Sequence, residues 1–234
     1  MKYYLGGYYL LQLKPIEFGT KIGEQVYTCS ECFNNHLLDI WAYSWTVDND
    51  KQATEAKENF KLTDDNISVI RTWVDTKHNE NKVGWKDVFT DLESAIEYRR
   101  TFFSHLEDIK ILALYFDQNE TKAILDEFRP ESEKMGEIGL RLTLLRQIEE
   151  FETNDEILIG YDFLGIEIAG SFHTFHCHDL GAEISKKFGL KLNSYGLFDK
   201  SDEWKPIVDY LNDENNGFEP VPWFVSKTKM ITNA

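Results

Sequence analysis

The sequence predicts an α+β fold, in which a mixed or antiparallel sheet packs against several helices in a single domain, residues 1–234. Three observations favour this class. Segments with the two-residue apolar period of strands alternate with segments of helical period, their order is irregular, and no repeat or low-complexity linker divides the chain. Hydrophobic residues make up 42% of the 234 residues, enough for one packed core. Residues 1–50 could form a looser N-terminal part.

The N-terminal half combines predicted strands with two helical regions. Gly6-Gly7 interrupts the first strand, Thr63-Asp64-Asp65 offers capping oxygens for a helix start, and Thr90 with Glu93 has the spacing of a capping box. The expected elements are strands at 3–13, 25–28 and 37–47, a helical region at 52–77, a helix at 92–103 and a strand at 109–116.

The C-terminal half is read in the same way. The helix at 138–151 is predicted from an apolar stripe with helical spacing, formed by Leu140, Leu144, Leu145, Ile148 and Phe151. Gly189 marks a helix end, and Pro222 indicates the start of a strand or a sheet edge. The expected elements are helices at 120–128 and 138–151, a strand at 157–168, an apolar series with helical spacing at 172–188 whose helix starts near Asp179, a turn at 193–196, a helix at 202–211 that Ser201 caps, and a strand at 221–231.

The charge balance restricts the class of partner. The chain has 25 Lys and Arg against 41 Asp and Glu, a formal net charge of -16. Phosphate contacts require basic side chains, so this balance argues against nucleic-acid binding and against docking on an anionic membrane. A basic protein partner is attracted instead, although the acidity could equally serve solubility alone.

The expected compartment is the cytoplasm. No apolar run approaches the roughly 18 residues that span a bilayer. The N-terminal residues 1–15 contain four tyrosines and no small-residue cleavage site follows them, so we expect no signal peptide. Three cysteines fit a reducing compartment better than a disulfide framework.

The stretch 157–198 is the richest in chemically active side chains. It contains His173, His176, Cys177 and His178, and imidazole and thiolate are good zinc ligands. However, the sequence His-Thr-Phe-His lacks the Glu of the zincin signature, and the zinc deaminase pattern also needs a Glu. We therefore expect hydrogen-bonded histidines and no cofactor, while metal binding by residues 173–178 stays an open alternative.

A second candidate for metal or redox chemistry is the pair Cys29 and Cys32, with His36 four residues further on. A zinc ribbon needs a second cysteine pair, and the remaining thiol is Cys177. A redox motif needs Cys29 at a helix start. We expect ordinary thiols here and assign no metal.

Several segments resemble a known class of bacterial proteins. They are residues 83–89 running into 92–95, residues 160–162, residues 171–177 and residues 193–197. Across roughly residues 80 to 225 the chain is similar to immunity proteins of polymorphic-toxin and contact-dependent growth inhibition systems. The resemblance implies a cytosolic protein that binds and blocks one cognate toxin, commonly a nuclease, without catalysis. It assigns no functional residues.

The partner-binding surface is expected around the loop 171–179 and its acidic neighbours. Acidic and aromatic side chains are suited to a basic toxin domain, because carboxylates can occupy phosphate-binding grooves while aromatic anchors supply buried contact. Further carboxylates stand at 155–156, 199–203 and 213–214. The predicted partner-binding residues are Asp162, Glu167, Phe172, His173, His176 and Asp179.

The competing hypothesis is a hydrolase. Cys177 would be the nucleophile and a nearby imidazole the base, or the 173–179 cluster would hold a metal. Adjacent residues rarely have the right relative orientation for this, because a nucleophile and its base usually meet through the fold. A third alternative is an acidic adaptor that associates with a host protein.

Overall fold

The structure, a computed structural model, describes residues 1–13, 26–30, 33, 54, 57–58, 60–84, 88–130, 139–167, 172–178, 180–199 and 204–233. The predicted strand at 37–47 with its aromatic stripe lies outside these ranges. Cys32, His36, Asp179 and Ser201 lie outside them as well.

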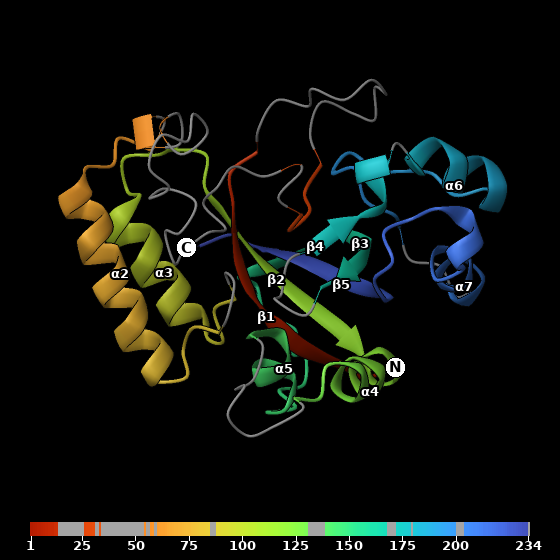
Figure 1. Cartoon of the computed structure of the whole chain (residues 1–234), viewed down its shortest axis with the longest axis horizontal. Coiled ribbons are helices and arrows are strands. Elements are labelled where there is room, and N and C mark those ends of the chain that lie inside the picture. The colour runs from red at the N-terminus through yellow and green to blue at the C-terminus, as the bar shows by residue number, and fades with distance from the viewer. Residues whose placement is uncertain are drawn as a thin grey trace.

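The centre of the fold is a five-stranded antiparallel sheet in the order β1-β2-β5-β3-β4 (Figure 1). Its strands are β1 (Tyr3–Leu11), β2 (Lys110–Asp117), β3 (Glu156–Ile166), β4 (Phe172–Thr174) and β5 (Trp223–Ile231). Because β5 lies between β2 and β3, Pro222 marks the start of a central strand, and the alternative of a sheet edge is wrong. With its packed helices, the chain has the predicted α+β fold.

The helices lie in three groups around the sheet. Figure 1 shows α2 and α3 together at one end, α6 and α7 together at the other, and α4 with α5 below the strands. The helices are α2 (Asp64–Asn79), α3 (Leu92–Phe102), α4 (Gln118–Glu127), α5 (Gly139–Leu144), α6 (Leu180–Phe188) and α7 (Lys205–Leu211). Two short 3-10 helices are also present: η3 (Phe175–His178) precedes α6, and η4 (Glu214–Asn216) follows α7. Among the described residues, no helix combines the length and the apolar character required to cross a membrane.

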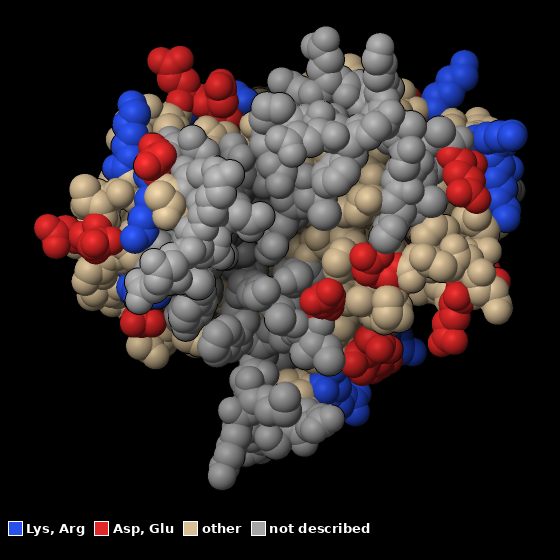
Figure 2. Space-filling view, turned by 45° about the horizontal axis from the view of Figure 1, so that its top comes forward, with Lys and Arg blue, Asp and Glu red and all other residues tan. Residues whose placement is uncertain are grey.

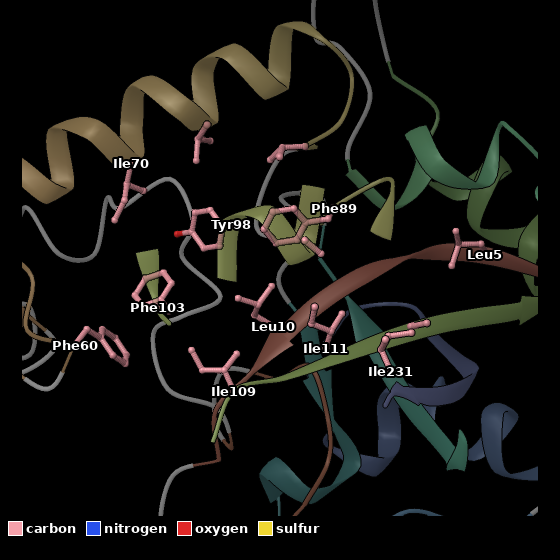
Figure 3. Close-up of a cluster of buried hydrophobic side chains, with 14 of the residues drawn as sticks. Leu5, Leu10, Phe60, Ile70, Phe89, Tyr98, Phe103, Ile109, Ile111 and Ile231 are labelled. Atoms are coloured by element: carbon pink, nitrogen blue, oxygen red, sulfur yellow. The ribbon is translucent and has the colours of Figure 1, made fainter. Parts of the chain in front are cut away.

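The core between the helices α2 and α3 and the strands β1 and β2 is formed by apolar side chains from both layers. Ile70 of α2 and Tyr98 of α3 are fully buried and point toward Leu10 of β1 and Ile111 of β2 (Figure 3). Burial of such side chains stabilises the fold by about 1.5–3 kcal/mol each. One face of the continuous apolar run of β2 and the apolar face of α2 are therefore buried in the same cluster.

Both predicted helix starts in this region are found, one of them shifted. Thr63 caps α2, and its side chain accepts a hydrogen bond from the Asn66 N–H in a capping box. The N-cap of α3 is Asp91 and not Thr90, since the Asp91 carboxylate accepts a 2.9 Å hydrogen bond from the Ser94 N–H. The Thr90 hydroxyl donates to the Asn81 carbonyl instead.

The predicted helix at 138–151 is mostly wrong, because α5 ends at Leu144. Gln147 has a φ of 48°, which breaks the helix. The following backbone pairs with the edge of β1: the Leu5 N–H donates to the Ile148 carbonyl, and the Glu150 N–H donates to the Tyr3 carbonyl. The buried part of the apolar stripe stops at Leu144, and Phe151 is 66% exposed.

The predicted strand at 25–28 is also wrong within the described residues 26–28. The Tyr27 N–H donates to the Tyr195 carbonyl, outside the sheet ladder. This contact fixes residues 26–30 beside the 193–196 turn, which forms as predicted, with Gly196 at a φ of 71°. The position matters because it brings Thr28, Cys29 and Ser30 close to β3.

Candidate functional site

The stretch expected to carry the site folds as strand, strand, 3-10 turn and helix. β3 pairs with β4 through Gly165 and His173, and η3 then leads into α6. The predicted helix is α6, which begins at Leu180, next to the expected start near Asp179, and ends before Gly189 at a φ of 70°, as predicted. The apolar series that precedes it is not helical at its beginning, because Phe172 and His173 lie on β4.

Three of the predicted partner-binding residues lie inside the core. Asp162 is 1% exposed, His176 is 2% exposed and Phe172 is 6% exposed. Phe172 packs edge-on against Tyr9 at a centroid distance of 5.2 Å. A partner-binding role for these three residues stays a prediction.

Two of the predicted residues, Glu167 and His173, lie nearer the surface and contact each other. His173 Nε2 is 2.8 Å from Glu167 Oε1, and its Nδ1 is 3.9 Å from Glu219 Oε1. The imidazole thus bridges the end of β3 to residue 219, just before β5. A partner-binding role for this pair stays a prediction, as does that of Asp179, which lies outside the described residues.

Asp162 forms the centre of a buried polar cluster. It pairs with Ser226 across β3 and β5, and Thr174 Oγ1 donates a 2.9 Å hydrogen bond to its carboxylate. Burial raises the pKa of Asp162 to about 7, although hydrogen bonds from Thr28 and Thr174 oppose this shift. Burial therefore favours the protonated form of the Asp162 carboxyl group.

The two described thiols border this cluster. Cys29 is buried, and burial together with the nearby Asp162 raises the pKa of its thiol well above the ordinary value. Cys177 is partly exposed, and its sulfur lies 3.3 Å from Ser30 Oγ. The reactive form of a cysteine is the thiolate, so Cys29 is held in its less reactive state.

The His176 imidazole is neutral and has a defined tautomer. Its Nε2 lies 2.7 Å from the Gly196 carbonyl oxygen, which can only accept, so Nε2 carries the proton. Burial lowers the pKa of His176 to about 4. Its Nδ1 is buried and has no hydrogen-bond partner among the described residues. Phe175 and Phe33 pack around the ring.

The hydrolase hypothesis requires a base beside Cys177. Of the three imidazoles near Cys177 in the sequence, those of His173 and His176 have Nε2 atoms that contact Glu167 and the Gly196 carbonyl. Within the part of the chain that the structure describes, no three His, Cys, Asp or Glu side chains converge as a metal site requires.

A charged network that the sequence analysis did not identify lies between the two helical ends of the molecule. Lys227 and Lys229 of β5 contact Glu150, and Lys229 also contacts Glu156, whose carboxylate accepts from the Tyr115 hydroxyl. The exposed fractions of the four charged side chains are 5–15%. The sequence Lys-Thr-Lys at 227–229 could have indicated this network, because residues two apart on a strand point to the same face of the sheet.

The chain was compared with known protein families, with curated proteins and with solved structures, and none of them matches.

Proposed function

We propose that the protein is an acidic binding protein that captures a basic protein partner, and that it serves as an immunity protein against a cognate toxin. The observation that carries this proposal is the excess of 16 negative charges in a chain of 234 residues. Complementary charge accelerates association and disfavours wrong partners. A nuclease toxin, whose active surface is basic in order to bind phosphates, suits such a protein.

The surface chemistry is consistent with this proposal. On the face shown in Figure 2, the Asp and Glu side chains of described residues form several separate groups, with Lys and Arg between some of them. Local acidic groups of this kind would give a basic partner several points of attachment. The immunity role itself derives from the resemblance of residues 80 to 225 to that class of proteins.

The direct test is affinity capture. The tagged full chain would be used as bait against the source-cell lysate and, separately, against co-expressed products of the neighbouring genes. We expect one basic protein to be retained in a stoichiometric complex that dissociates as the salt concentration rises, because screening weakens exposed charge pairs. Retention of no basic protein in either arm would contradict the proposal.

A second experiment distinguishes the binding function from the hydrolase alternative. Cys177→Ala removes the proposed nucleophile from a partly exposed position, with Cys29→Ala as the matched control at a buried thiol. We expect the Cys177 variant to keep full partner capture. Loss of a measurable hydrolytic activity in this variant alone would favour the hydrolase.

A further inference from the structure

A groove lined by both apolar side chains and carboxylates, the latter called here its acidic rim, lies between the end of α4 and the connection from α7 to β5. It has a volume of about 500 Å³. Its apolar lining comes from Leu211, Phe218, Val221 and the two prolines at 220 and 222. Figure 1 shows the two helices that border it, α7 to the right of the strands and α4 below them.

Four carboxylates line the same groove. Glu127 stands at the end of α4, Asp213 and Glu214 stand at the start of η4, and Glu219 precedes β5. In the described part of the chain, no Lys or Arg forms an ion pair with Glu127, Asp213 or Glu214. By contrast, the Lys205 and Asp209 side chains of the neighbouring α7 are paired with each other at 2.7 Å.

The Asp213 carboxylate is fixed in its ionised form. The backbone N–H and the side-chain amide of Asn215 both donate to its Oδ1, at 3.0 and 2.8 Å. These bonds, with a smaller effect from Lys187, lower the pKa of Asp213. The Lys187 ammonium itself lies 3.7 Å from the centre of the Tyr210 ring. Asp213 therefore contributes a negative charge to the rim of the groove at neutral pH.

We propose that this groove receives a lysine or arginine side chain of the basic protein partner, with its methylene stem on Phe218 and Val221 and its cationic head among Glu127, Asp213 and Glu214. This inference rests on the proposed function and names the surface that carries it. Long basic side chains bury their stems along apolar walls while the head stays near charge and water, which is what this combination of lining residues offers. The groove also lies beside the partner-binding surface predicted around residues 171–179, because Glu219 of the groove contacts His173.

The test uses a blocked arginine-containing peptide as the probe and the same peptide with citrulline in place of arginine as the matched neutral ligand. Backbone amide shifts of the full-length protein would be followed by NMR during each titration. We expect the arginine peptide to shift residues 211–222 and the citrulline peptide to leave them unchanged. Shifts located elsewhere, or equal shifts with both peptides, would overturn the proposal.

Two double variants distinguish binding in the groove from nonspecific attraction by the net negative charge of the chain. Glu127→Gln with Glu214→Gln removes two rim charges, while Glu107→Gln with Glu152→Gln removes two exposed charges elsewhere. We expect the groove variant to bind the arginine peptide about tenfold more weakly and the control variant to bind as the wild type does. Equal weakening in both variants would contradict a groove site.

Two further outcomes distinguish this inference from the proposed function. Spermidine that shifts residues 211–222 while the arginine peptide does not would overturn the assignment to a protein side chain. If the groove variant still captures the partner from lysate with wild-type affinity, the groove proposal fails and the binding function stands. If the peptide binds in the groove but no partner is captured, the groove stands and the proposed function fails.

Discussion

Lys229 Nζ lies 2.6 Å from Glu150 Oε1, and this contact ties the middle of β5 to the segment that follows α5. Both side chains are largely buried, with exposed fractions of 8% and 14%. The attraction of the carboxylates raises the pKa of Lys229 against the effect of burial. The contact also explains why residues 148–150 are not helical. They lie along β1, and this position places Glu150 beside Lys227 and Lys229.

Lys229→Met should therefore destabilise the protein. Glu150 keeps its contact with Lys227, but Glu156 loses its cation while its side chain is 5% exposed. Removing one partner of a buried ion pair lowers the free energy of unfolding by about 3 kcal/mol. Urea unfolding measures the change. Lys205→Met is the control, because Lys205 and Asp209 pair in solvent and that variant should unfold at nearly the wild-type midpoint. Equal midpoints for the two variants would count against a stabilising network.

Asp162→Asn should change how stability depends on pH. The pKa of Asp162 is about 7 in the folded protein, against 3.8 as its ordinary value. Between these values the unfolded chain releases the proton and the folded chain retains it, so this group lowers stability as the pH rises from about 4 to 7. Asn removes the effect and can still accept from Thr174. The stability of the variant relative to wild type should therefore rise over this range, and a difference independent of pH would refute the shifted pKa.

His176 should remain neutral at pH 5.5, with its proton on Nε2. Its pKa is lowered to about 4 by burial, and the Gly196 carbonyl accepts from Nε2. Long-range nitrogen–proton NMR spectra of the imidazoles measure both properties, and His176→Gln assigns the signal. Because the unfolded chain takes up this proton first, His176 lowers stability as the pH falls from about 6.5 to 4. An imidazole that titrates near 6.5 would contradict the buried position.

Gly160→Ala should destabilise the bulge that precedes Asp162. Gly160 has a φ of 144°, and a Cβ there would lie 2.6 Å from the Leu197 Cβ. A residue other than glycine in this region loses about 1–3 kcal/mol of stability from backbone strain alone. Gly189→Ala is the matched control, since its φ is also positive and its Cβ would meet nothing within 4 Å. Thermal unfolding should show a larger loss for Gly160→Ala, and the reverse order would contradict the tight contact.

Local signals in the sequence predicted much of the fold. The β-branched and aromatic run 109–116, the capping residues before α2 and Gly189 after α6 each act within a few residues, and each feature is found. The helix at 138–151 failed for a different reason. Its apolar spacing was helical, but long-range pairing with β1 and the contact between Glu150 and Lys229 compete with helix formation there.

The candidate site was less predictable. Sequence proximity grouped Asp162, His173 and His176, yet strand alternation and the η3 turn place Asp162 and His176 inside the core and His173 near the surface. One partner of Asp162, Thr28, and the Cys177 contact Ser30 lie more than a hundred positions away in the sequence, and no local pattern indicates these contacts. The Asp213-Glu214 pair was recognised as acidic, whereas the groove beside it depends on Glu127 of a separate helix.

The central claim is neutralisation of a basic toxin through binding, and a growth assay tests it most directly. The captured partner would be produced from an inducible promoter in a susceptible host, alone or together with this chain. The account predicts growth arrest with the partner alone and restored growth when this chain is present. Growth arrest that persists despite formation of the complex would contradict an immunity role.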